Sequence, residues 1–161
     1  MVQIVEANFS NKIHCDDFVI LLNEYACCVM GGGTALDLRV QNNLPAEIAS
    51  RDFITVFMAY DNGTAIALLT CMEGFSTFQC RPLMNIHDVY VTKEYRGQGI
   101  STKLLFLAEK LAIKNSCCKL TLEVLQGNTT AKMVYKKFGF EGYTLNSESG
   151  NALFWEKKLI Q

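Results

Sequence analysis

The stretch from Asn85 to Leu111 constrains the fold of this chain more than any other part of its sequence. β-branched residues over 86–91 predict a strand, and the glycine-rich turn Arg96-Gly97-Gln98-Gly99-Ile100-Ser101 follows a few residues later. An amphipathic helix is predicted after the turn, because apolar residues recur at the spacing of one helix face: Leu104, Leu107, Ala108, Leu111 and Ala112. The pattern therefore predicts a strand, a tight turn and a helix in succession.

The turn at 96–101 has the properties of an anion site. A helix that begins after small residues presents unpaired backbone N–H groups and the positive end of its dipole, and glycines let a ligand approach the backbone closely. The most natural ligand is a pyrophosphate. The dinucleotide pattern G-x-G-x-x-G fits poorly, because Thr102 occupies its third glycine position, although Glu123 could supply the acid that follows about 20 residues later. A P-loop is excluded, since the sequence contains no G-x-x-x-x-G-K-[ST] string.

Length and composition favour one domain over 1–161. The chain has 161 residues, half of them hydrophobic, and we find no internal repeat or linker. No apolar run approaches the ~18 residues of a membrane helix, and the N-terminus lacks the pattern of a signal peptide. We therefore expect a cytoplasmic protein without a membrane partner, in which the seven cysteines are reduced thiols.

Charge is distributed unevenly along the chain. The net charge of −1 does not indicate a nucleic-acid partner. Residues 1–80 carry three basic and nine acidic side chains, whereas residues 81–161 carry twelve basic and seven acidic ones. A basic half suits a polyanionic cofactor and an acidic half a cationic substrate, although such charges also simply decorate solvated faces. The sequence shows neither metal-ligand spacings nor a serine-hydrolase pattern, so we predict no metal.

The predicted elements follow the order βααβββαβαββ, which describes an α+β fold. Strands are expected at Val2–Ala7, Phe53–Tyr60, Thr64–Met72, Leu83–Val91, Lys119–Leu125, Glu141–Leu145 and Asn151–Leu159. Helices are expected near 11–29, 45–50, 100–112 and 129–137, the last capped by Asn128 or Thr129 and ended by Gly139. Glu73–Arg81 is expected to be a polar connection. Because a helix joins strands 83–91 and 119–125, these two should be parallel within a mostly antiparallel sheet.

The turn resembles a motif of the GNAT family of N-acetyltransferases. Arg96-x-x-Gly99-x-Ser101 is similar to its R/Q-x-x-G-x-G/A loop, with Ser101 in place of glycine or alanine. Asn128 after the fifth strand, Tyr135-Lys136-Lys137-Phe138-Gly139-Phe140 and the element order also match. The chain further resembles a bacterial subgroup of uncharacterised members at Gly31–Gly33, Gly74–Phe78 and Leu83–Asp88. The resemblance implies the GNAT acyltransferase fold and acetyl-coenzyme A as co-substrate, and the subgroup supplies no acceptor.

The resemblance also implies which residues bind the co-substrate. In the family, the loop cradles the pyrophosphate and the edge of the preceding strand contacts the pantetheine arm. Transferred to this sequence, the binding residues are Val89, Val91, Arg96, Gly97, Gln98, Gly99, Ile100, Ser101 and Asn128.

The implied reaction is acetyl transfer to a primary amine of a small molecule or peptide, by direct attack in a ternary complex. The family places Tyr135 beside the coenzyme A sulfur as general acid, whereas helical periodicity alone favours a core tyrosine. A histidine in the strand of His87 serves as base in some members, which makes His87 and Asp88 the candidates. Neighbours in a strand point to opposite faces, so we expect different roles, with Asp88 orienting a neighbour or binding the ammonium.

Alternatives stay open at this point. His87 and Asp88 could form a purely structural pair, and Glu73 and Glu123 are weaker candidates for the base. A non-catalytic acyl-coenzyme A-binding module on the same fold is the second function class, because fold does not imply activity. Gly31–Gly33 is either a mobile loop near the acceptor or a simple helix stop. Family precedent implies a homodimer, through the C-terminal strands or residues 73–81.

Overall fold

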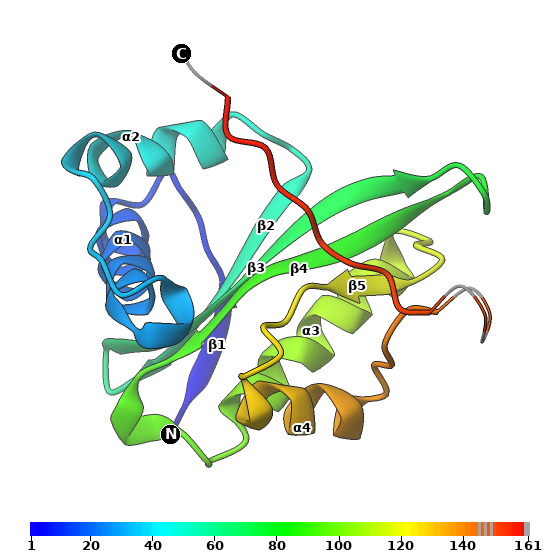
Figure 1. Ribbon diagram of the computed structural model, residues 1–161. Coiled ribbons are helices and arrows are strands. Elements are labelled where there is room, and N and C mark those ends of the chain that lie inside the picture. The colour runs from blue at the N-terminus through cyan, green and yellow to red at the C-terminus, as the bar shows by residue number, and fades with distance from the viewer. Residues whose placement is uncertain (145, 147, 149, 160–161) are drawn as a thin grey trace. The chain divides into compact units, whose positions relative to one another are not determined.

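The computed structural model describes residues 1–161 except 145, 147, 149, 160 and 161. It divides the chain into two compact units, Met1–Leu122 and Glu123–Gln161. The first unit contains one five-stranded sheet with the order β1-β2-β3-β4-β5. In Figure 1, helices α1 and α2 cover one face of this sheet and α3 covers the other. The described helices include none that combines the length and apolar character needed to cross a bilayer.

The order of elements follows the prediction through the fourth helix. The strands are β1 (Gln3–Glu6), β2 (Ile54–Asp61), β3 (Thr64–Ser76), β4 (Arg81–Val91) and β5 (Leu120–Leu122). The helices are α1 (Lys12–Cys27), α2 (Leu38–Ala49), α3 (Ile100–Lys114) and α4 (Thr129–Phe138), with short 3-10 turns η1 (Val29–Gly31) and η2 (Lys93–Tyr95). Strands β1 to β4 are antiparallel and β4–β5 is parallel, which confirms the predicted mixed sheet.

The core lies on both faces of the sheet, as the apolar runs in β2 and β3 require. On the face covered by α1 and α2, one cluster joins side chains from both helices and three strands: Phe18, Leu21, Ile48, Val56, Met58, Leu68 and Tyr90. On the other face, Leu104, Leu105 and Ala108 of α3 are fully buried. Burying each large apolar side chain stabilises the fold by about 1.5–3 kcal/mol, so these contacts stabilise the packing of α1, α2 and α3 on the two faces of the sheet.

Helix α2 begins seven residues before the predicted start at Pro45. The prediction used the preference of proline for the first turn of a helix and was wrong, because Asp37 provides a stronger start. Its carboxylate accepts a hydrogen bond from the Arg39 amide at 2.7 Å and caps the helix. Pro45 therefore lies inside α2, where Leu44 and Ile48 pack against the core.

Strands β3 and β4 form a longer hairpin than predicted. The segment Glu73–Arg81, expected to be a connection, pairs residue by residue up to Ser76 with Arg81, so the turn contains only residues 77–80. Of the polar residues that favoured a loop, Thr77 and Gln79 lie in the turn, whereas Glu73, Ser76 and Arg81 are strand positions. The prediction of a connection over Glu73–Arg81 was therefore wrong, and β3 and β4 extend the sheet as far as Ser76 and Arg81.

The described residues of 141–159 do not form the two closing strands that were predicted. Over the described part of 141–159 there is an isolated bridge between Thr144 and Asn151, next to a hydrogen bond from the Ala152 amide to the Tyr143 carbonyl at 3.0 Å. Leu145, the end of the first expected strand, lies outside the described residues. A strand needs a neighbouring strand to pair with, and Leu153–Trp155 are more than 70% exposed instead. β5 is also shorter than the predicted Lys119–Leu125.

Candidate active site

The sheet forks after Ile86. β4 and β5 pair over three residues only, from Met84 with Leu120 to Ile86 with Leu122. β5 ends there, whereas β4 continues to Val91 and remains paired with β3. Within the described first unit, this last part of β4 therefore has a strand on one side only. A strand edge of this kind offers backbone donors and acceptors to an extended ligand.

The backbone groups of Val89 and Val91 face this open edge. The Thr92 amide donates to the Ile66 carbonyl of β3 at 2.9 Å. Because hydrogen-bonded and non-hydrogen-bonded residues alternate in an antiparallel pair, the two valines direct their N–H and C=O groups away from β3. The Val91 carbonyl already accepts from Arg96 Nε at 3.0 Å. Val89 is therefore the residue of this edge best suited to bind a pantetheine amide.

A β-bulge at His87, next to the fork, changes the face of the sheet toward which the following side chains of β4 point. Cys71 pairs with Ile86 while the adjacent Thr70 pairs with Asp88, so one step along β3 matches two steps along β4 and His87 is the extra residue. Cys71 and Thr70 face opposite sides of the sheet as strand neighbours. Ile86 and Asp88, although two residues apart, consequently also face opposite sides.

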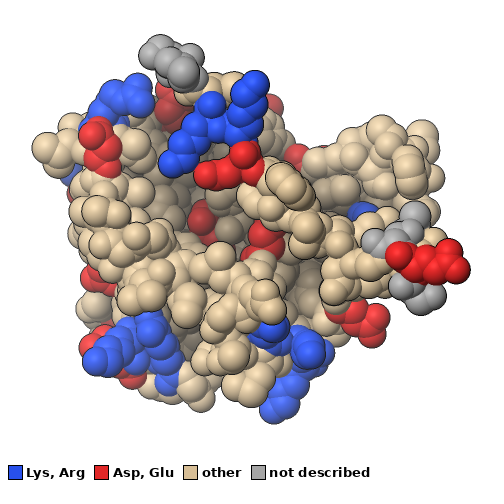
Figure 2. Space-filling view, viewed as in Figure 1, with Lys and Arg blue, Asp and Glu red and all other residues tan. Residues whose placement is uncertain are grey.

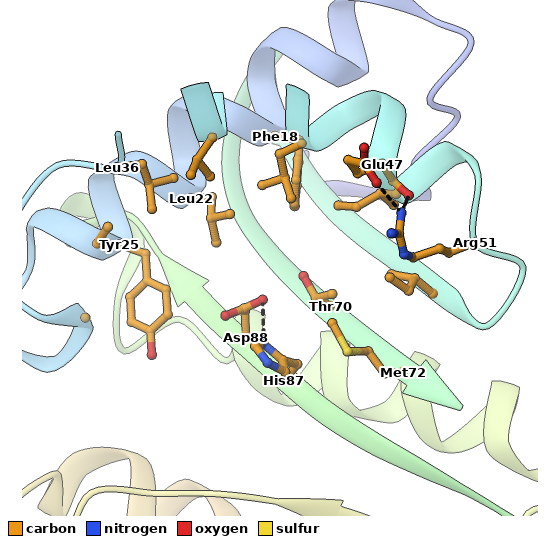
Figure 3. Close-up of a pocket in the computed structure, with 16 residues that line it drawn as sticks. Phe18, Leu22, Tyr25, Leu36, Glu47, Arg51, Thr70, Met72, His87 and Asp88 are labelled. Carbon is orange, nitrogen blue, oxygen red and sulfur yellow. Dashed lines mark hydrogen bonds and ion pairs between the residues drawn. The ribbon is translucent and has the colours of Figure 1, made fainter. Parts of the chain in front are cut away.

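The bulge brings His87 and Asp88 together. Nδ1 of His87 lies 3.2 Å from Oδ2 of Asp88, and both side chains line one cavity (Figure 3). The imidazole is 54% exposed and the carboxylate 18%. The expectation that the two side chains point to opposite faces is wrong, because the bulge breaks the alternation on which it depends.

The cavity has a volume of about 540 Å³ and lies between the sheet, α1 and α2. Figure 3 shows Thr70, His87 and Asp88 on the strands and Phe18, Leu22 and Leu36 across from them. The space-filling view shows a mostly uncharged surface over α1 and the segment after it (Figure 2). Most of the lining is apolar, which is typical of sites for small ligands.

Three polar features distinguish the cavity. Glu47 and Arg51 form an ion pair at 2.7 Å, so their charges offset each other. Tyr25 also lines the cavity, and the pKa of its hydroxyl is raised by burial and, to a lesser extent, by the negative charge of Asp88. The Thr70 hydroxyl is buried without a hydrogen-bond partner among the described residues. Neither Tyr25 nor Thr70 belongs to a motif, so sequence reasoning missed both.

The glycine-rich turn leaves open space at the start of α3. Gly97 and Gly99 have φ values of +76° and +75°, which disfavour any other residue, and the space that a Cβ would occupy at either position is open. Gly99 is the N-cap of α3 and no side chain caps the helix. The first amides of α3, including those of Ile100 and Ser101, therefore have no side-chain cap and lie at the positive end of the helix dipole.

The arginine and glutamine of the turn have structural partners. The Arg96 guanidinium lies 5.8 Å from the ring centre of Tyr90, which in turn stacks on Tyr25 at 5.8 Å. Gln98 Nε2 donates to the Glu94 carbonyl at 3.2 Å. Arg96 thus joins the turn to the wall of the cavity, in addition to any contact with an anion.

Gly31 packs closely against the end of α1. A Cβ at this position would lie 1.9 Å from the Tyr25 carbonyl oxygen, so only glycine fits. Gly31 ends η1 and also lines the cavity. Of the two interpretations of Gly31–Gly33, the structure favours the helix stop, placed beside the cavity.

The second unit carries the remaining predicted residues. Asn128 caps α4, because its Oδ1 accepts from the Ala131 amide at 3.1 Å. Tyr135 is half-buried and its ring meets that of Phe140 at 5.9 Å, edge to face. Gly139 ends the helix with φ +107°, as predicted. These contacts define the local setting of Asn128 and Tyr135 within Glu123–Gln161.

A forked mixed sheet with a glycine turn opening the next helix defines the acyltransferase class of α+β folds. A sequence model of the acetyltransferase (GNAT) family matches residues 20–140. The chain belongs to the GNAT family.

Individual relatives match over shorter stretches. The chain is 37% identical over 71 residues to thialysine N-epsilon-acetyltransferase of Bos taurus, covering 44% of this chain and 41% of that protein. It is 32% identical over 89 residues to an uncharacterized N-acetyltransferase of Archaeoglobus fulgidus, covering 55% and 60%. The chain thus spans less than half the length of the thialysine acetyltransferases that it matches.

Solved structures share the fold over nearly the whole chain. A complex of AAC(6')-Iy with the bisubstrate analog CoA-S-monomethyl-acetylneamine has a TM-score of 0.76 at 17% identity, covering 99% of both chains. Ribosomal-protein-alanine N-acetyltransferase from Brucella melitensis has a TM-score of 0.68 at 16% identity, covering 100% of this chain and 99% of that one. These similarities concern the fold alone.

Proposed function

We propose that this chain transfers an acetyl group from acetyl-coenzyme A to a primary amine of a small molecule or peptide. The observation that carries the proposal is the fork in the sheet: beyond Ile86 the open edge of β4 is followed by the glycine turn, while the bulge presents His87 and Asp88 to a cavity. We further propose that residues 1–161 act as one N-acetyltransferase domain, since the family match extends across both compact units.

Most of the proposed co-substrate site lies in the first unit. The amides of residues 97–101 hold the pyrophosphate at the start of α3, where the open space beside Gly97 and Gly99 admits it. Backbone groups of Val89 bind the pantetheine arm along the open edge. Bound acetyl-coenzyme A supplies an activated thioester. Asn128, beyond its capping role, and Arg96 complete the proposed set of binding residues.

His87 and Asp88 prepare the acceptor. The Asp88 carboxylate binds the ammonium, and His87 accepts the proton that the nitrogen must lose before it can attack the carbonyl carbon. The C–N bond then forms and the C–S bond breaks by direct attack in a ternary complex. Tyr135 acts as general acid and gives a proton to the leaving sulfur, and the second proton that the nitrogen loses as the amide forms restores the Tyr135 hydroxyl through solvent. His87 finally releases its proton to solvent, so protons balance over the cycle.

The second candidate is a non-catalytic acyl-coenzyme A-binding module on the same fold. It would use the same turn and open edge, so coenzyme A binding alone does not separate the two functions. The presence of an exposed imidazole beside a carboxylate in the cavity favours the enzyme, because binding of coenzyme A requires neither group. We also propose a cytoplasmic location and a homodimer, the latter tested by sedimentation equilibrium.

The experiment combines two measurements on the same purified protein. Thermal unfolding with and without coenzyme A tests the cofactor site, and release of the free thiol from acetyl-coenzyme A with a panel of amines tests the reaction. Binding together with amine-dependent thiol release supports the enzyme. Binding without turnover of any amine supports the module, and absence of both contradicts the assignment of the turn.

A further inference from the structure

The strand side of the cavity holds a polar atom that lacks a partner. Thr70 is 2% exposed, and its hydroxyl makes no hydrogen bond within the described residues although it lies at the lining of the cavity. Thr70 pairs directly with Asp88 across β3 and β4. A buried hydroxyl without a partner costs free energy. Such an atom, set beside a carboxylate, indicates a place where a ligand donates hydrogen bonds.

The charge at this end of the cavity fits one cation. Asp88 is 18% exposed and contacts the imidazole of His87. The other lining carboxylate, Glu47, is paired with Arg51 at 2.7 Å on α2. Asp88 therefore contributes the carboxylate that a ligand ammonium can reach without displacing a cationic side chain of α2. A second ammonium would meet either the Glu47–Arg51 pair or an apolar wall.

The remaining walls are apolar. They come from α1, from the segment after it and from α2 and β3: Phe18, Leu22, Leu36, Leu44, Ile48 and Met72 (Figure 3). A volume of about 540 Å³ accommodates a compact organic body beyond the amino group. A ligand with a second charge or several hydroxyls would place these polar groups against the apolar walls. The groups would lose their water there and find no hydrogen-bond partners to replace it.

We propose that the acceptor is a monoamine carried on an apolar body, with its ammonium between Thr70 and Asp88 and its body against the walls formed by α1 and α2. This inference rests on the proposed function and narrows its substrate class. It excludes polyamines and polyhydroxylated amines as preferred acceptors. The same chemistry occurs in free alkyl or arylalkyl amines and at the N-terminus of a peptide whose first side chain is apolar.

The decisive comparison uses two amines with the same six-carbon chain. Hexylamine and 1,6-diaminohexane differ only in a second ammonium at the far end. We expect kcat/KM for hexylamine to exceed that for the diamine by at least ~10-fold, the usual scale of discrimination by an apolar pocket. Equal values, or a preference for the diamine, would overturn the inference and leave acetyl transfer itself intact. The peptides Phe-Gly-Gly and Asp-Gly-Gly test whether the acceptor is a peptide or a free amine. Faster turnover of Phe-Gly-Gly than of hexylamine assigns a peptide, and slower turnover assigns a free amine.

Binding provides a readout that does not depend on catalysis. If no amine is acetylated, the proposed function fails, and calorimetric titration of the two amines into protein loaded with coenzyme A then tests the inference alone. Tighter binding of hexylamine than of the diamine supports it. Equal or weaker binding overturns it.

Substitutions at two positions test the proposed ammonium site and the apolar wall of the cavity. Thr70→Val removes the hydroxyl at nearly constant shape, so it should weaken hexylamine binding while the midpoint of thermal unfolding stays equal or rises. Leu36→Glu places a carboxylate on the apolar wall and should shift the ratio of kcat/KM toward the diamine by ~10-fold, whereas Leu36→Gln should not. An unchanged ratio in Leu36→Glu, or unchanged hexylamine binding in Thr70→Val, would contradict the assignment.

Discussion

His87 Nδ1 and Asp88 Oδ2 lie 3.2 Å apart although the two residues are consecutive in β4. Their proximity depends on the bulge, which inserts His87 between the pairs Cys71–Ile86 and Thr70–Asp88. A regular strand would send one of the side chains to the face of α3. The irregularity therefore places an imidazole and a carboxylate in one cavity at the point where the sheet opens.

Replacing His87 tests the proposed base. His87→Gln keeps a polar side chain of similar reach but cannot accept the proton, so kcat/KM at neutral pH should fall by roughly 10²-fold. A base acts when unprotonated, so the wild-type kcat/KM should fall on the acidic side of its pH profile. The acceptor amine titrates too, and the mutant separates the two groups: loss of the acidic limb assigns it to His87. An unchanged pH dependence of kcat/KM in His87→Gln would mean that His87 has a structural role and is not the base.

Replacing Asp88 tests the proposed ammonium site. Asp88→Asn keeps the shape and removes the charge, so KM for the amine should rise by ~10-fold or more with a smaller change in kcat. The pKa of Tyr25, which burial and then Asp88 hold above its ordinary value, should fall but stay raised. Ultraviolet titration against a Tyr25→Phe background measures this pKa. A mutant with unchanged KM and unchanged Tyr25 titration would contradict the placement of Asp88.

Ser101 offers a test of the pyrophosphate site without disturbing the glycines. A ligand that binds only the native state adds about 2.7 kcal/mol to the free energy of unfolding at roughly 100 times its Kd. Ser101→Glu should keep the fold, because an acidic residue in the first turn favours a helix, yet it should abolish stabilisation by coenzyme A. Lys110→Glu changes the net charge more than Ser101→Glu does, but it lies two and a half turns further along α3. Coenzyme A should still stabilise this variant. Equal stabilisation of both variants would contradict the site.

Tyr135 is tested by removal of its hydroxyl alone. If it protonates the leaving sulfur, Tyr135→Phe should lower kcat by roughly 10²-fold while the Kd for coenzyme A stays within about twofold. Packing of the ring against Phe140 is retained in the variant. Single-turnover kinetics measure the chemical step directly. An unaffected chemical step would make Tyr135 a packing residue.

Local patterns predicted the strand, turn and helix at 86–112 because each element there depends on neighbouring residues. Gly99 is required by its own φ, and Asn128 caps α4 through a bond three residues away. The same logic failed for α2, where the preference of Pro45 for a first turn competed with the cap at Asp37, and the cap decided the start.

The candidate site was less predictable because it depends on pairing between distant residues. The bulge at His87 follows from the register of β3 against β4, which no local pattern reveals. Thr70 and Tyr25 read as an ordinary strand residue and an ordinary helix residue, and they reach the cavity only through the packing of α1 on the sheet. Motifs therefore predicted the glycine-rich turn and the helix after it, whereas the cavity beside His87 and Asp88 required the structure.

The central claim is that the chain acetylates an amine, and mass spectrometry of the amine tests it most directly. Wild-type protein incubated with acetyl-coenzyme A and hexylamine should yield N-acetylhexylamine in amounts equal to the free coenzyme A released. Ser101→Glu and His87→Gln should each reduce the yield. Release of coenzyme A without acetylated hexylamine or any other acetylated amine of the panel, or no release at all from protein that binds coenzyme A, would contradict the account.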